Sequence, residues 1–236
     1  MKKKIIAAFL TAAMTIGSLS GVTVFAADAG TDENVEMADA SDVDGTTITF
    51  WHSMGGVNGE AIDTLVKKFN DENEYGITVD AQYQGEYDDS LNKLKSAQIG
   101  NMGADLVQVY EIGTRFMIDS GWVVPMQDLI DAAGFDTSDL EPNVLAYYTV
   151  DNKLYSMPFN SSTPILYYNK DMFEKAGIEE IPTSLEGILN ISDQLMSQGG
   201  AGEAISIGIY GWFVEQWLCK QGLNFADKGN GYGSGV

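Results

Sequence analysis

The chain has 236 residues and a formal net charge of -21 at pH 7, from 34 acidic residues against 13 lysines and arginines. Nucleic acids and anionic membranes are polyanions that bind proteins through dense Lys and Arg, so this composition makes both poor partners. The single cysteine, Cys219, excludes an internal disulfide, and 44% hydrophobic residues suffice for one sizeable core or two small ones.

The N-terminus predicts export. Residues 2–4 are lysines, residues 5–25 are apolar and small, and Val24-Phe25-Ala26 provides the small residues typical of a signal-peptidase site, which predicts a signal peptide over 1–26. We therefore expect the protein in the periplasm or at the outer face of the cell membrane. An acylated lipoprotein needs a cysteine at the cleavage point, and the single cysteine of this chain is Cys219, so we do not expect an acylated lipoprotein. A retained N-terminal anchor is the competing interpretation.

Residues 27–45 are rich in Asp, Glu, Ala, Gly and Thr and contain few large apolar side chains. Such a segment cannot bury enough surface to offset its ordering entropy, so we expect a disordered acidic spacer.

Alternating strands and helices follow the spacer. Residues 46–51 predict a strand, a helix begins at Asn58, and residues 77–83 alternate as a second strand. Asp88 and Asp89 open a second helix that Gly100 closes, and residues 104–110 predict a third strand. Short connections between such elements imply right-handed crossovers and a parallel sheet covered by helices.

The second half repeats this α/β style. The expected elements are extended runs at 153–159 and 164–168, a helix at 171–176, a helix capped by Thr183 or Ser184, a strand at 205–209 and a helix at 212–222. We place the first lobe at 46–150 and a partial second lobe at 151–236, with the crossover near 147–153.

Three motifs occur in order along the body: Trp51-His52-Ser53-Met54, Gln108-Val109-Tyr110-Glu111-Ile112-Gly113-Thr114, and Phe159-Asn160-Ser161-Ser162-Thr163-Pro164. With these motifs, the region from about 48 to 232 resembles the glycerol-3-phosphate-binding proteins of bacterial ABC importers, within the sugar-type extracellular solute-binding family 1. The resemblance implies a periplasmic-binding-protein-like two-lobe fold of type II, with parallel sheets flanked by helices. It also implies capture of a small polyol, with glycerol-3-phosphate or a glycerophosphodiester as first choice.

The resemblance also implies ligand-binding residues. Tyr87 closes a Tyr-x-Gly-x-Tyr pattern, Glu111 lies in Gln-Val-Tyr-Glu, and Ser162 is the second serine of its motif, next to Ser161. In an open parallel sheet such residues lie beyond the carboxyl ends of the strands, where ligands bind. Trp212, in a Gly-Trp pair, would pack on the carbon face of the ligand.

Each candidate has a plainer interpretation. Glu111 can pair with Arg115 one helical turn on, the two serines can be turn residues, and Trp212 can belong to a core. His52 and Ser53 have no implied contact with the ligand, and we expect them to order the loop beneath it.

The family's chains are longer, and they carry a phosphate-binding arginine in a later segment. We therefore expect a C-terminally truncated, incomplete member of the fold, in which Arg115 does not replace that arginine. A neutral mono- or oligosaccharide is the alternative ligand. An ABC permease is the expected membrane partner, and a monomer is the expected state.

A secreted glycoside hydrolase is the alternative of another class, and Asp88 and Glu111 are its only carboxylate pair near the expected site. His52 and Ser53 are too close in sequence for the usual Ser-His-Asp arrangement. No metal-ligand spacing or phosphate-binding glycine motif is found, so we expect no catalytic residue, no metal and no cofactor.

Overall fold

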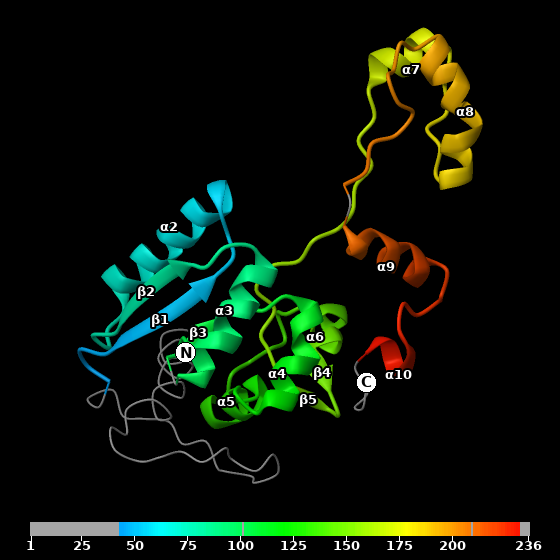
Figure 1. The fold of residues 1–236 in the computed structure, drawn as a ribbon. Helices are drawn as coiled ribbons and strands as arrows, with labels where there is room; N and C mark the ends of the chain where they lie inside the picture. Colours follow the sequence, from blue (N-terminus) through cyan, green and yellow to red (C-terminus); the bar gives the residue numbers. More distant parts are fainter. Residues whose placement is uncertain (1–42, 101, 209, 232–236) are drawn as a thin grey trace. The chain divides into compact units, whose positions relative to one another are not determined.

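The computed structural model describes residues 43–100, 102–208 and 210–231 (Figure 1). The predicted signal peptide and most of the predicted spacer lie outside the described residues. The chain divides into two compact units, Met1–Asn160 and Ser161–Val236. This division falls further along the chain than the lobe boundary predicted between 150 and 151, and the assignment of lobes stays a prediction.

A three-stranded parallel sheet forms the centre of the first unit. Strands β1 (Thr47–His52), β2 (Thr78–Tyr83) and β3 (Leu106–Val107) lie in the order β2-β1-β3. Phe50 of β1 is in register with Ala81 on one side and Leu106 on the other. The predicted parallel sheet is thus confirmed, with β1 in its middle.

Helices α2 (Gly56–Glu72) and α3 (Tyr87–Ile99) make the two crossovers (Figure 1). Helix α2 packs against β2 and buries Ile62. A small core at the start of the sheet is formed by buried Val43, Ile48 and Ile77, against which Phe69, Tyr75 and Val79 pack. Ile48 has no exposed surface.

Two asparagines, one in the last turn of α2 and one at its C-cap, hold the helix to the edge strand β2. The side chain of Asn70 donates to the Val79 carbonyl at 3.0 Å and accepts from the Val79 amide at 2.8 Å. Asn73 likewise donates to the Ile77 carbonyl at 2.9 Å and accepts from its amide at 3.0 Å. The two side-chain amides thus pair with backbone N–H and C=O groups on the side of β2 that faces away from β1, and they fix α2 on the sheet.

The remainder of the first unit is mainly helical. It contains the 3-10 turn η2 (Glu111–Gly113), α4 (Thr114–Ser120), α5 (Met126–Ala133) and α6 (Pro142–Tyr148). An antiparallel hairpin of β4 (Thr149–Val150) and β5 (Lys153–Leu154) follows, turned by Asp151 and Asn152 at φ of 52° and 63°. The extended run expected over 153–159 is paired as a strand only at Lys153–Leu154, where the ladder to β4 ends.

The second unit contains α7 (Lys170–Ala176), α8 (Leu185–Ser197), α9 (Gly211–Lys220) and the short α10 (Asp227–Asn230). Helices α7 and α8 pack side by side around buried Phe173, Ala176 and Leu195 (Figure 1). The predicted cap of α8 is confirmed, because the Ser184 hydroxyl accepts from the Gly187 amide at 3.0 Å.

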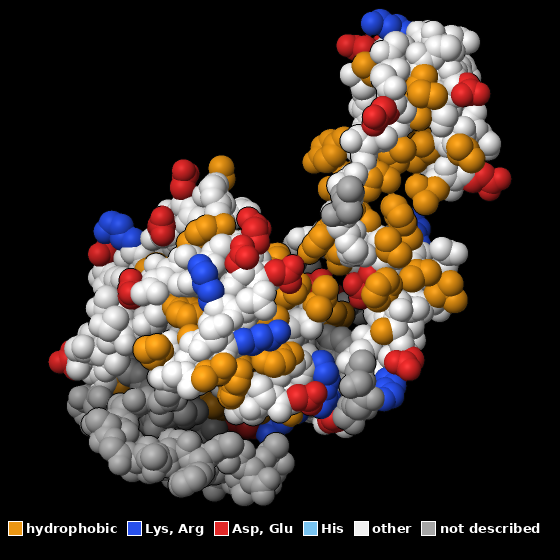
Figure 2. All heavy atoms as spheres, in the orientation of Figure 1, with side chains coloured by type: hydrophobic (Ala, Val, Ile, Leu, Met, Phe, Trp, Pro, Cys, Tyr) orange, Lys and Arg blue, Asp and Glu red, His pale blue; other side chains and the backbone are white. Residues whose placement is uncertain are grey.

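The sequence predicts an extended run at 164–168 and a strand at 205–209 in this unit, and the strand does not form where the structure describes it. Residues 164–168 and the described part of 205–209 have no ladder partner among the residues that the structure covers. Most of their apolar side chains are exposed, as for Tyr167 at 88% and Ile165 at 70%, whereas Ile205 is half-buried. Figure 2 shows hydrophobic side chains on this unit's surface. No helix within the described ranges has the length and apolarity that crossing a membrane requires.

Candidate functional site

The candidate site lies beyond the carboxyl ends of the three parallel strands. Strand β1 ends at His52, β2 at Tyr83 and β3 at Val107. Backbone pairing continues past these ends, since the Gln84 amide donates to the His52 carbonyl and the Gln108 amide to the Trp51 carbonyl, both at 2.9 Å. The three following loops are therefore held next to one another, as expected for a ligand site of this fold.

A chain of side-chain hydrogen bonds fastens these loops. The Ser53 amide donates to Oε1 of buried Gln108 at 2.8 Å, and Nε2 of Gln108 donates to Oδ1 of Asn160 at 2.7 Å. Nδ2 of Asn160 in turn donates to the Tyr87 hydroxyl at 3.2 Å. Elements far apart in sequence thus meet at Tyr87.

Asn160 reaches this position because the residue before it is anchored on the sheet. The ring of Phe159 meets Phe50 of β1 edge to face, with 6.0 Å between centroids. The last residues of the first unit therefore run along the carboxyl edge of the sheet.

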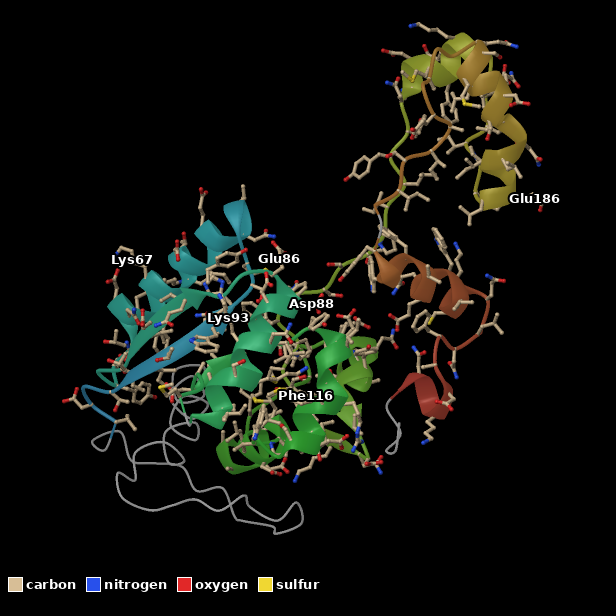
Figure 3. The ribbon with its side chains drawn as sticks, viewed as in Figure 1. Lys67, Glu86, Asp88, Lys93, Phe116 and Glu186 are labelled. Carbon is tan, nitrogen blue, oxygen red and sulfur yellow. The ribbon has the colours of Figure 1, made fainter. Side chains whose placement is uncertain are left out.

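Two tyrosines form a flat aromatic wall at the site. The rings of Tyr87 and Tyr110 are stacked, with centroids 5.4 Å apart and planes 3° from parallel. The Tyr110 hydroxyl donates to Asp88, which lies in the first turn of α3 (Figure 3). This bond and the stack restrain both rings, so that they offer a preformed apolar face.

Glu111 begins η2 directly after this wall and is half-buried. Its charge acts on Tyr148 at the end of α6: burial raises the pKa of Tyr148, and the neighbouring Glu111 and Tyr87 raise it further. Tyr148 therefore lies within electrostatic reach of both predicted ligand-binding residues of the first unit.

Sequence reasoning missed four residues of this site. Gln108, Tyr110 and Asn160 lie inside the quoted motifs, and a glutamine directly after a strand, such as buried Gln108, is a usable signal for a structural network. Tyr148 lies in no motif, so no sequence pattern points to it.

His52 is buried beneath the site. Its Nδ1 accepts from the Met54 amide at 3.3 Å, and its ring lies near Phe50 and Tyr83, with centroids 5.5 and 6.0 Å away. Burial lowers the pKa of His52, while the charge of Asp63 opposes this shift. These contacts fit the expected role of ordering the loop.

The other three predicted ligand-binding residues belong to the second unit. Ser161 and Ser162 are exposed. Trp212 is half-buried at the start of α9, with its ring centroid 6.3 Å from that of Tyr210 and 5.9 Å from that of Phe213. A common site that joins these residues to Tyr87 and Glu111 stays a prediction.

The ion pair described near the site joins two residues of one helix. Arg115 forms an ion pair with Asp119 within α4, and this hydrogen bond is the main cause that raises the pKa of Arg115. Among the residues described, no three His, Cys, Asp or Glu side chains form a group that could hold a metal ion.

Comparison with known proteins identifies the family. Residues 64–235 match the model of the bacterial extracellular solute-binding proteins. The sn-glycerol-3-phosphate-binding periplasmic protein of Shigella flexneri serotype 5b (strain 8401) is 42% identical over 197 residues, which cover 79% of this chain and 44% of that protein. The chain thus spans less than half the length of this curated relative.

Solved structures show the same fold at lower identity. The GacH receptor of Streptomyces glaucescens GLA.O, solved unliganded and with acarbose, matches with a TM-score of 0.53 and 22% identity, over 66% of this chain and 39% of that one. The cyclic alpha-maltosyl-1,6-maltose binding protein of Arthrobacter globiformis matches with a TM-score of 0.56 and 19% identity, over 78% and 49%. The predicted α/β fold and the predicted resemblance are confirmed, and the chain belongs to the bacterial extracellular solute-binding proteins.

Proposed function

We propose that the protein is the exported capture component of an ABC importer and binds glycerol-3-phosphate or a glycerophosphodiester without altering it. The observation that carries the proposal is the stack of Tyr87 on Tyr110 beyond the carboxyl ends of the parallel strands, with Glu111 next to Tyr110 along the chain. The relative from Shigella, named for sn-glycerol-3-phosphate binding, supports the choice of ligand.

The chemistry of this edge suits a small polyol. A carboxylate such as that of Glu111 accepts hydrogen bonds from two adjacent hydroxyls, and each bond to a charged group contributes about 1.5–3 kcal/mol net. The stacked rings of Tyr87 and Tyr110 offer an apolar face to the C–H groups of the same ligand. Ser161, Ser162 and Trp212 would complete the site from the second unit.

Capture then depends on a change of conformation. A ligand that touches both lobes favours their closed arrangement in proportion to its greater affinity for that arrangement. The closed form would be the one that a membrane permease recognises. We propose that the protein acts as a monomer at the outer side of the cell membrane.

A neutral mono- or oligosaccharide is the second candidate ligand. Asp88 and Glu111 at this edge are both acidic, which suits hydroxyl donors better than a phosphate. The cation of Lys93 lies on the same side, where its Nζ donates to the Gln84 carbonyl at 2.8 Å. Of the two solved structures named above, one was obtained with acarbose and the other is a cyclic alpha-maltosyl-1,6-maltose binding protein. Catalysis is not part of the proposal, and release of sugar from a chromogenic glycoside would argue for it.

Calorimetric titration of the complete gene product tests the function. Glycerol-3-phosphate, glycerophosphocholine and maltotriose serve as ligands, with inorganic phosphate as competitor. Glu111→Gln should weaken binding by about tenfold or more, because it removes one charged acceptor. Glu60→Gln, an exposed change of the same kind on α2, should leave binding unchanged.

Each result has a distinct meaning. Binding of both phosphorylated ligands, weakened by inorganic phosphate, supports the first choice. Binding of maltotriose alone, with no effect of phosphate, supports the saccharide instead. If Glu111→Gln and Glu60→Gln bind alike, Glu111 is not part of the site.

A further inference from the structure

The hydrogen-bond chain that ends at Tyr87 has a fixed direction. A backbone N–H can only donate, so the Ser53 amide requires an acceptor, and Oε1 of Gln108 provides it at 2.8 Å. The other end of the Gln108 amide is then its NH2 group, which requires an acceptor from Asn160. Oδ1 of Asn160 meets it at 2.7 Å.

The same logic fixes the amide of Asn160. Its oxygen is engaged by Gln108, so its NH2 group faces Tyr87, and Nδ2 donates to the phenol oxygen at 3.2 Å. Reversing this amide would put two NH2 groups against each other. Reversing Gln108 as well would put its NH2 against the Ser53 N–H, at a position where Gln108 is only 9% exposed. Asn160 itself is exposed, so its orientation follows from that of buried Gln108, where a donor–donor contact is strongly unfavourable.

We propose that Asn160 is a positioning residue that makes Tyr87 a hydrogen-bond donor to the ligand. Because the phenol oxygen accepts from Asn160, the phenol proton points away from that amide. The stack on Tyr110 restrains the ring, so the proton has a limited set of directions. Tyr87 therefore selects a ligand that presents an acceptor oxygen at this point, from a hydroxyl, an ether or a phosphoryl group.

This inference rests on the proposed function for the identity of the ligand, but the direction of the bond can be measured without ligand. In the 15N-labelled complete gene product, the side-chain amide signals of Asn160 are assigned by their loss in Asn160→Asp. Tyr87→Phe keeps the stacked ring and removes the acceptor, so it should move the proton signals of the Asn160 amide upfield. The side-chain amide of exposed Asn92 is the control and should not move. Unchanged Asn160 signals in Tyr87→Phe would overturn the proposal.

Binding of glycerol-3-phosphate provides the second test, as a double-mutant cycle. Asn160→Asp presents an acceptor to the phenol and draws its proton away from the ligand. It should weaken binding by about tenfold or more with Tyr87 present, and clearly less in the Tyr87→Phe background. Any repulsion between the new charge and the ligand acts in both backgrounds and cancels from the comparison.

The two failures can be told apart. Equal losses in both backgrounds would show that Asn160 acts through the fold or through charge, and would overturn the positioning role. If the unaltered protein binds none of the three ligands, the proposed function fails. The shift of the Asn160 amide signals then still decides whether Asn160 orients Tyr87.

Discussion

Asn70 offers a direct test of how helix α2 is held to the sheet. Its side chain makes two hydrogen bonds to the backbone of Val79, at 3.0 and 2.8 Å, on the free edge of β2. Asn70→Ala removes both and leaves a partly buried N–H and C=O without their partner. At about 0.5–1.5 kcal/mol net for each bond, the free energy of unfolding should fall by about 1–3 kcal/mol.

The gain in helix propensity from alanine opposes this loss, so a matched control is needed. Asn58→Ala lies on the same helix at an exposed position and carries the propensity effect without the two bonds. The difference between the two variants in urea unfolding then measures the contact between Asn70 and β2.

Hydrogen exchange localises the effect. The Val79 amide should exchange faster in Asn70→Ala than in Asn58→Ala, while the Gln84 amide, which donates to the His52 carbonyl, should be less affected. If the two variants unfold within about 0.5 kcal/mol of each other, the bonds do not stabilise the fold as argued.

Three further outcomes are expected. Ile48→Ala, at a position with no exposed surface, should lower the free energy of unfolding by about 2–5 kcal/mol. The control Val57→Ala, at 80% exposure, should change it by less than about 0.5 kcal/mol. Equal effects of the two variants in urea titrations would contradict the proposed core. The raised pKa of Tyr148 means that the unfolded chain loses this proton first, so stability should fall as the pH rises above about 10, and Tyr148→Phe should reduce that fall. The lowered pKa of His52 means that the unfolded chain binds the proton first as the pH falls below about 6.5, so stability should decrease there. Asp63→Asn should lower the pKa of His52 further in an NMR titration, and an unchanged value would show that Asp63 does not act on it.

The sequence predicts the sheet of the first unit because its apolar residues alternate where one face is buried. Ile48 and Phe50 are both buried, and the parallel pairing of β1 with β2 is as expected. The third strand is shorter than the predicted 104–110. The Asp105 carboxylate accepts from the Thr49 amide at 2.9 Å, and so occupies the place of a backbone partner just before β3.

The predicted strand at 205–209 shows the limit of pattern alone. The alternation of apolar and polar residues predicts which face of a strand would be buried, but a strand also needs a neighbouring strand to pair with. In the described part of the chain the only ladders are β1 with β2 and β3, and β4 with β5. Caps depend on neighbouring residues alone, and of the two predicted candidates, Thr183 and Ser184, the structure shows Ser184 as the cap through its bond to Gly187.

Tyr87 and Glu111 are expected at the site from the resemblance of their motifs, and both follow strands of the parallel sheet; their contact with a ligand stays a prediction. Tyr148 could not be found in this way, because it reaches the site through the packing of α6 and the turn that follows. The direction of the Gln108 and Asn160 amides likewise depends on contacts between residues more than fifty positions apart. A sequence pattern carries no information on such contacts.

The hairpin after α6 has a consequence for the order in which the site assembles. Its strands are joined by two residues, and the Tyr155 amide closes onto the Tyr148 carbonyl, so this part can form in about 1–10 μs. The parallel ladder must first close a loop that contains α2, which is slower. In pulse-labelled refolding the Tyr155 amide should therefore gain protection before that of Gln84. Tyr148 would then be in place before Tyr87, whose position depends on β2 and α3.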